Sequence, residues 1–533
     1  MKKIALVSAG LLALALIATT CARQYGFRRS YSQANALLHD SQNLAAKPFL
    51  KAHLRNGSIC ILRDSWQVDT IYRHLEGTGD LYDFNRQLLK QGPLLIDLDS
   101  VAVFETNRKL TGSENERVSA LTILAGLDLV LGIFCLTNPK ACFGSCPTFY
   151  LGSGDNLFHS DAEGFTNSIA PCLEAGDIDA LDNGRIVGGR LSLMMKNEAM
   201  ETHVVKEVKI YAVPRRDGER VFHTPGDKFF LCRRIRPPAS ARADEGDCLE
   251  QLKGNDKRER FSLSDPENMR SREEIALAFD PSGMGDRLGL AIGFRQTLMT
   301  TYLIYSAFGY MGDEMGGILA RLEQDGPRKA DLGGIRRELG DIEIYRWDHD
   351  GGRWQKQGGF YETGPIAVNH QFLPLDGPND GREVRIKLVL NRGLWRIDYL
   401  ALAEIVEQVQ PIVLATETIE YIKTGDEPAL SSAASPDRPV ISMPGDVRNF
   451  RFRLPNPAED YELFLYSRGY YLEWMRSSWV KEKDLGRLAR MLMVPRLYLK
   501  EEAADYKRYE TVMEREFWET RIDNRMFSYY EKK

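Results

Sequence analysis

The sequence lacks the local motifs that identify several enzyme classes. It contains no GxxxxGK[ST] phosphate loop, no GxSxG nucleophile turn and no HExxH zinc motif. It also lacks a strong excess of charge, since 70 Lys and Arg residues stand against 75 Asp and Glu residues, a net charge of −5. Nucleic-acid binders normally concentrate positive charge, so we expect no nucleic-acid partner. Nothing in these patterns calls for a cofactor, and we expect none.

The N-terminus, by contrast, carries a clear pattern. Lys2 and Lys3 precede an apolar run over residues 4–18, and small residues lead to Cys21. A short basic flank before such a run is typical of an export signal. The end of the segment resembles the lipobox of bacterial lipoproteins, which implies that Cys21 is lipidated and becomes the new N-terminus. The alternative is an uncleaved anchor helix. Either way we expect a membrane-anchored protein of the cell envelope, periplasmic or surface-exposed.

Eight cysteines are few for a disulfide scaffold but enough for local bridges. The segment CFGSCP places Cys142 and Cys146 in one compact loop. In an exported chain a bridge between them is the first interpretation. A metal site with Cys172 or His159, a redox dithiol and free buried thiols remain open. This segment resembles a Cys-Phe-Gly-Ser/Thr-Cys-Pro loop of uncharacterised bacterial envelope proteins, a resemblance that implies a following strand but no activity.

A second pair of cysteines, Cys232 and Cys248, flanks a segment rich in charge, Pro and Gly. We interpret residues 236–272 as a long polar loop or a domain boundary. A bridge between the two cysteines would close a loop worth about 3 kcal/mol in the chain-entropy model. Unpaired burial of both thiols is the alternative.

The fold class is predicted from alternating strands and turn residues. Asn56-Gly57 predicts a hairpin, and strand pairs are expected at 342–354, 384–399 and 450–466. Alternation predicts further strands at 190–194 and 204–211. The sequence therefore predicts a mainly β fold with α: antiparallel β-sandwich-type domains, a few buried helices and a C-terminal helix over residues 500–521 with an apolar stripe of Tyr506, Tyr509, Met513 and Phe517. The expected divisions are a signal segment (1–21), a small β module (35–115), a β domain opening with the Cys142/Cys146 loop (138–235), an α+β or β-sandwich domain (274–425) and a hairpin with a helical end (440–533).

Two apolar stretches are long enough to cross a bilayer. Residues 118–137 contain Asp128 and residues 288–311 contain Arg295. A charge within lipid is costly, whereas a protein core can hold it with hydrogen bonds and a counter-charge. We therefore expect both stretches to be buried in protein, residues 118–137 as a helix or hairpin and residues 288–311 as a helix, with a membrane span as the alternative.

One polar segment, residues 197–203, brings Glu198, Glu201 and His203 close together between two strands. Such a group either binds a metal or transfers protons, or it is a turn whose side chains cap backbone groups. The carboxylate pair of a glycosidase is not excluded, because its separation depends on the fold. We expect a structural or binding role with a protein or saccharide ligand. The alternatives are an envelope hydrolase with its site within 190–400 and a thiol redox or metal protein.

Overall fold

The computed structural model describes part of the chain. The described residues are 50–54, 58–62, 66–69, 72–82, 88–106, 147–151, 158–181, 189–197, 201–256, 258–312, 315, 318, 333–362, 364–422, 429–431, 439–442, 446–473 and 482–519. The predictions for Cys21, Cys142, Cys146 and residues 118–137 lie outside them.

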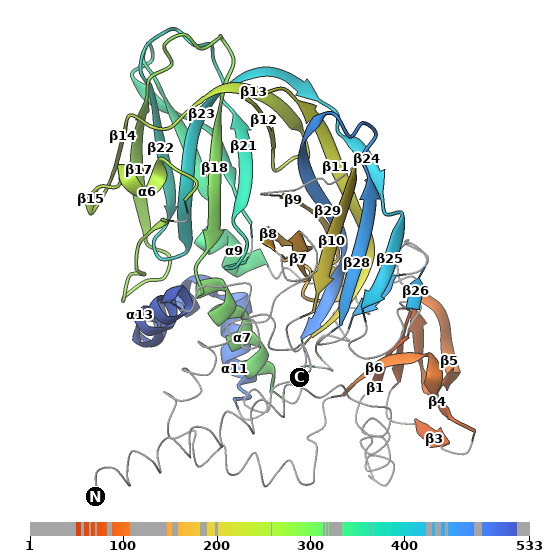
Figure 1. Ribbon diagram of the computed structural model, residues 1–533. Helices are drawn as coiled ribbons and strands as arrows, with labels where there is room; N and C mark the ends of the chain where they lie inside the picture. The colour runs from red at the N-terminus through yellow and green to blue at the C-terminus, as the bar shows by residue number, and fades with distance from the viewer. Residues whose placement is uncertain are drawn as a thin grey trace, which may run out of the picture.

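The described strands form five antiparallel sheets, named here A to E, which confirms the mainly β fold class (Figure 1). Sheet A has the order β3-β4-β2-β1-β6 with β5 on β4, and comprises β1 (Leu50–Leu54), β2 (Ile59–Leu62), β3 (Gln67–Asp69), β4 (His74–Tyr82), β5 (Leu88–Asp97) and β6 (Val101–Thr106). Sheet B has the order β26-β25-β28-β10-β7-β8, and comprises β7 (Thr148–Leu151), β8 (Phe158–Glu163), β10 (Arg190–Lys196), β25 (Thr418–Ile422), β26 (Ala429–Ser431) and β28 (Val447–Arg453).

Sheets C, D and E contain the remaining strands. Sheet C has the order β24-β11-β29-β9 with β27 on β11, and comprises β9 (Ala175–Ala180), β11 (Glu201–Arg215), β24 (Ile412–Ala415), β27 (Val440–Ser442) and β29 (Asp460–Glu473). Sheet D has the order β12-β13-β23-β18-β21 with β16 on β23, and comprises β12 (Glu219–His223), β13 (Phe229–Arg236), β16 (Arg260–Phe261), β18 (Leu288–Gln296), β21 (Asn369–Pro374) and β23 (Trp395–Val409). Sheet E has the order β15-β14-β17-β22-β19-β20, and comprises β14 (Ser240–Ala243), β15 (Gly246–Asp247), β17 (Arg272–Phe279), β19 (Ile342–Asp348), β20 (Arg353–Phe360) and β22 (Val384–Asn391).

Helices complete the described structure. They are the 3-10 helices η1 (Leu98–Ser100) and η2 (Pro171–Leu173), and the α-helices α6 (Leu249–Leu252), α7 (Met299–Met311), α9 (Gly333–Leu339), α11 (Leu485–Met493), α12 (Pro495–Glu501) and α13 (Ala503–Glu519). In the view of Figure 1, α7, α11 and α13 lie below the strands of sheets D and E. Within the described ranges, no helix combines the length and apolarity that crossing a membrane requires.

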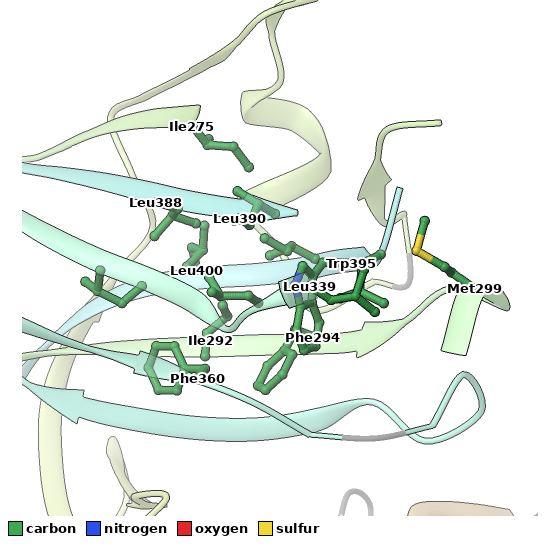
Figure 2. Close-up of a cluster of buried hydrophobic side chains, with 14 of the residues drawn as sticks. Ile275, Ile292, Phe294, Met299, Leu339, Phe360, Leu388, Leu390, Trp395 and Leu400 are labelled. Atoms are coloured by element: carbon green, nitrogen blue, oxygen red, sulfur yellow. The ribbon is translucent and has the colours of Figure 1, made fainter. Parts of the chain in front are cut away.

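Two sandwiches hold the main hydrophobic cores. Sheets B and C enclose one core, in which alternate residues of β10, β11, β28 and β29 are buried. Sheets D and E enclose the larger core, and side chains of α7, α9, α11, α12 and α13 close its lower end. Figure 2 shows Phe294 and Trp395 of sheet D beside Leu339 of α9 and Met299 of α7. The helices therefore pack on the end of the D/E sandwich, and positions on them are fixed by that core.

Some predicted strand pairs are hairpins in the structure. β1 and β2 pair on either side of Asn56-Gly57, and β19 pairs with β20 as the predicted hairpin at 342–354. Two of the predicted strand pairs do not form, although the strands themselves are present. β22 pairs with β17 and β19 in sheet E, whereas β23 pairs within sheet D. β28 belongs to sheet B and β29 to sheet C. In each case the turn carries the chain across a sandwich, because both strands must bury an apolar face against the same core.

The stretch 288–311 is not one buried helix, which corrects the prediction. It is the fully buried strand β18, a short turn and the helix α7. Arg295 lies on β18 and is 5 % exposed. Its Nε lies 2.7 Å from Oε1 of the buried Glu259, and its Nη1 donates to the backbone oxygens of Pro365 and Ile366. The expectation that a core would hold this charge with a carboxylate and hydrogen bonds is confirmed.

The segment 236–272 is not a surface loop either. It contributes β14, β15 and β16 to sheets D and E and the short helix α6. Arg260 is 3 % exposed and forms a two-bond ion pair with Glu273, each N–O distance being 2.7 Å. Its many charges misled the interpretation, because several of them pair with one another inside the fold.

The C-terminal helical region is two helices, α12 and α13, separated at Glu502. Tyr506 is fully buried, but Tyr509, which the predicted apolar stripe included, is 45 % exposed. The buried side of α13 instead carries Glu510 and Glu514. Glu510 accepts hydrogen bonds from the backbone N–H and hydroxyl of Ser264, so carboxylates hold this helix as well as apolar contacts.

Candidate functional site

An arginine-lined cleft lies where α9, α12 and the start of β17 meet. Its volume is about 560 Å³. The lining residues are Arg270, Arg272, Gly334, Arg337, Glu338, Pro495 and Arg496. Four of the seven are arginines, and one is a carboxylate. We call this feature the arginine cleft.

Local structure explains how the cleft is built. The helix α9 ends at Gly340, whose N–H donates to the carbonyl of Arg336 and whose φ is +75°. That left-handed conformation favours glycine. A Cβ at Gly340 would lie 2.0 Å from Nη2 of Arg272, so the absent side chain makes room for this guanidinium. On the other wall, Pro495 occupies the first turn of α12, where a missing N–H costs nothing.

The charges of the cleft do not balance. Nε of Arg270 lies 2.7 Å from Oε2 of Glu338, and Nε of Arg496 lies 2.8 Å from Oε1. The hydrogen bond from Arg496, followed by the charge of Arg270, lowers the pKa of Glu338. Glu338 therefore stays ionised and orients two guanidinium groups. Arg272 and Arg337 also line the cleft, so four arginines stand against one carboxylate and the lining is predominantly basic.

In the predicted polar segment 197–203, Asn197 follows β10 and Glu201 and His203 begin β11, whereas Glu198 lies outside the described residues. Oε1 of Glu201 lies 2.7 Å from Nε2 of His203, and both side chains are 0 % exposed. The side chain of Asn197 donates to the backbone oxygens of Glu201 and Ser442. The proximity of the carboxylate and imidazole is confirmed. Complete burial and backbone capping fit a structural role inside sheet C better than contact with a substrate.

A group of carboxyls, here the acidic junction, lies at the edge strand β9 and comprises Glu163, Asp177, Asp179 and Glu362. Asp179 is 4 % exposed, and its Oδ2 has no hydrogen-bond partner among the described residues. Burial, and then the charges of Asp177, Glu362 and Glu163, raise the pKa of Asp179 well above its usual value.

Asp177 is less enclosed than Asp179. Burial raises its pKa to about 6 against the opposing effect of backbone hydrogen bonds from Ile178 and Thr166. Oε1 of Glu362 accepts hydrogen bonds from Thr166 and Asn167 at 3.3 and 3.2 Å. The junction can therefore hold protons near neutral pH. Among the described residues, no three His, Cys, Asp or Glu side chains are placed to hold a metal ion.

The predicted cysteine sites fare differently. Cys232 and Cys248 are both free thiols, so the bridge considered between them does not form. The reason is packing: Cys232 belongs to an apolar cluster on the outer face of sheet D, and Cys248 to the core between sheets D and E. Burial raises the pKa of Cys248 to about 11 and that of Cys60 to about 12. These thiols are poor nucleophiles at neutral pH.

The weaker metal candidates are His159 and Cys172. They lie on different elements, β8 and η2. The remaining members of that predicted set, Cys142 and Cys146, fall outside the described ranges.

Comparisons with known proteins add little. Neither a protein-family model nor a curated protein sequence matches the chain. Among solved structures, the chain is similar to a GH31 alpha-xylosidase from Xanthomonas citri, with 8 % identity and a TM-score of 0.14. The match covers 84 % of this chain and 38 % of that one, so the chain spans well under half the length of the neighbour. A likeness this weak carries no argument about fold or activity.

Proposed function

We propose that this chain is an exported, membrane-attached binding protein of the bacterial envelope. Its arginine cleft takes a ligand that carries oxyanion groups, such as carboxylates or phosphates. The observation that supports the proposal is the cleft itself, whose lining holds four arginines and one carboxylate. The N-terminal pattern up to Cys21 supports the envelope location.

Guanidinium chemistry explains the choice of ligand. Each guanidinium presents paired N–H donors that match the geometry of a carboxylate or phosphate. Glu338 holds Arg270 and Arg496 in place before a ligand arrives, which reduces the entropy lost on binding. Arg272 is exposed on the cleft wall, and its nearest described acceptor is the carbonyl of Asp341 at 3.4 Å, a weak contact. Its donors remain available to an oxyanion.

Calorimetric titration of the purified full chain with inorganic pyrophosphate tests the proposal. The double variant Arg272→Gln/Arg337→Gln should weaken binding by at least about tenfold, since each charge-assisted contact contributes about 1.5–3 kcal/mol. The matched control is Arg382→Gln/Arg385→Gln, two exposed arginines outside the cleft on sheet E and its preceding turn. Equal weakening in both variants would indicate a general charge effect and refute the proposal, as would unchanged binding in the cleft variant.

The acidic junction favours a second candidate, an envelope hydrolase acting on saccharide or peptide. A carboxyl such as Asp177, whose pKa is raised to about 6, is suited to donate a proton to a leaving group. This candidate predicts hydrolysis of aryl glycosides or peptides by the full chain, with a rate that falls as the pH rises through about 6 and Asp177 loses its proton, and Asp177→Asn should remove most of that activity. Activity that persists unchanged in Asp177→Asn and Asp179→Asn would remove the junction from consideration.

A further inference from the structure

The junction of α11 and α12 exposes a run of large apolar side chains. Leu492 is 39 %, Met493 81 %, Val494 49 % and Leu497 48 % exposed. Isolated exposed apolar residues are ordinary, but four within six positions form a contiguous patch. We call residues 492–497 the apolar turn.

The apolar turn is held rigidly from inside. Leu488 and Met491 of α11, with Tyr498 and Leu499 of α12, are buried in the core of the D/E sandwich. The carboxylate of Asp484 accepts a hydrogen bond from the N–H of Arg487 and caps the start of α11. The outward side chains are therefore presented on a fixed base, and are not the consequence of a frayed helix end.

The apolar turn and the arginine cleft are one continuous surface. Pro495 and Arg496 belong to the turn and also line the cleft. A Cβ on Gly334 of α9 would lie 3.4 Å from Cγ of Pro495 and 3.7 Å from the carbonyl oxygen of Leu492. Two lining residues of the cleft, Pro495 and Arg496, therefore follow the exposed Leu492, Met493 and Val494 directly along the chain. An apolar tip beside a basic pocket is the combination that peripheral proteins use at a charged bilayer.

We infer that this face docks on a bilayer rich in anionic phospholipid. The apolar turn enters the boundary between headgroups and acyl chains, and a lipid phosphate occupies the arginine cleft. The inference rests on the proposed function, because it identifies the oxyanion as a headgroup phosphate. Charge complementarity favours a bilayer with a net negative surface, and the N-terminal segment ending at Cys21 is predicted to keep the chain beside one.

Hydrogen–deuterium exchange of the full chain, reconstituted in lipid vesicles through its own N-terminus, tests the inference. The two vesicle compositions are phosphatidylcholine alone and phosphatidylcholine with 30 % phosphatidylglycerol. Peptides that cover residues 488–499 should exchange at least about fivefold more slowly in the anionic vesicles, and salt should reverse the difference. Equal exchange in both vesicle types would overturn the inference.

Three variants separate the contributions. Met493→Asp/Leu497→Asp should abolish the slowing while binding of pyrophosphate is retained. Arg272→Gln/Arg337→Gln should abolish both the slower exchange and the binding of pyrophosphate. The matched control is Val413→Asp on β24, a residue 56 % exposed in sheet C, which should change neither.

The two proposals fail in different ways. Pyrophosphate binding without slower exchange in anionic vesicles overturns bilayer docking and leaves the proposed function standing. Slower exchange without pyrophosphate binding supports docking and overturns recognition of a free oxyanion. Slowing that survives in Met493→Asp/Leu497→Asp contradicts the role of the apolar turn.

Discussion

Arg396 on β23 and Glu514 on α13 form an ion pair in which the side chains are 0 % and 3 % exposed. The second carboxylate oxygen of Glu514 accepts the backbone N–H of Leu298, just before α7. The guanidinium of Arg396 also lies 3.7 Å from the ring centroid of Phe261. One buried carboxylate therefore ties the C-terminal helix α13 to sheet D and to the start of α7.

Removal of this carboxylate should be costly. Glu514→Gln leaves Arg396 only the buried carboxylate of Glu259, which lies 3.8 Å away and also pairs with Arg295, and we expect the free energy of unfolding to fall by about 3 kcal/mol. The control Glu501→Gln breaks the exposed pair with Arg490 and should cost less than about 1 kcal/mol. Denaturant titration measures the free energy of unfolding of both variants. A loss for Glu514→Gln as small as that of the control would contradict the stabilising role of this buried ion pair.

A glycine substitution tests how the cleft is shaped. Gly340→Ala places a methyl group where the Arg272 guanidinium lies, so pyrophosphate binding should weaken at least about threefold beyond any loss of stability. Gly381→Ala is the matched control, because its φ of +78° is equally left-handed but nothing lies within 4 Å of the added Cβ. Both variants should lose about 1 kcal/mol of stability from backbone strain. Titration calorimetry measures pyrophosphate binding by both variants. Equal affinity of the two would contradict a role of Arg272 in binding.

The acidic junction should destabilise the fold at neutral pH. The pKa of Asp177 is raised to about 6 in the folded chain, from 3.8. The folded state binds more protons between those values, so stability falls as pH rises through them. Asp177→Asn should therefore raise the free energy of unfolding by about 3 kcal/mol at pH 7 and leave it unchanged near pH 3.5. Urea titrations at the two pH values measure this gain in the free energy of unfolding. A gain that does not depend on pH would contradict the raised pKa of Asp177.

His223 should act in the opposite direction. Burial, and then the charge of His370, lower its pKa from 6.5 to about 4. The unfolded chain takes up this proton at higher pH than the folded chain, so stability is lost as pH falls from 6.5 to 4. His223→Phe, which keeps an aromatic ring against Phe229 and Phe464, should reduce that loss by about 3 kcal/mol. If the free energy of unfolding in urea depends on pH as it does in the unchanged chain, another group causes the loss of stability at low pH.

Sequence patterns predicted local structure better than pairing. The alternation in β10, β11 and β19 identified those strands, and Asn56-Gly57 identified a hairpin. Pairing of β11 with β29 joins residues such as Val208 and Ser467, and no local signal records such a partner. The turns after β22 and β28 resemble hairpin turns in composition, but burial of both strands against one core makes them cross between sheets.

The candidate site was beyond sequence reasoning for a similar reason. Arg270 and Arg272 come from one segment and Arg337 and Arg496 from two distant ones, and singly each looks like a solvated surface charge. The residues 197–203 did predict a close carboxylate and imidazole, since neighbours in sequence stay neighbours in space. The acidic junction again joins distant segments, β8, β9 and the residue Glu362 after β20. Only Asp177 and Asp179, two positions apart on one strand face, gave a local sign of it.

The most direct test of the central claim is to locate a bound oxyanion. Crystals of the full chain soaked in selenate, followed by anomalous diffraction at the selenium edge, would place the anion without assumptions about the natural ligand. The account predicts an anomalous peak within the cleft, in hydrogen-bond distance of the guanidinium groups of Arg272 and Arg337, and its loss in Arg272→Gln/Arg337→Gln. Well-ordered selenate at other arginines with an empty cleft would contradict it.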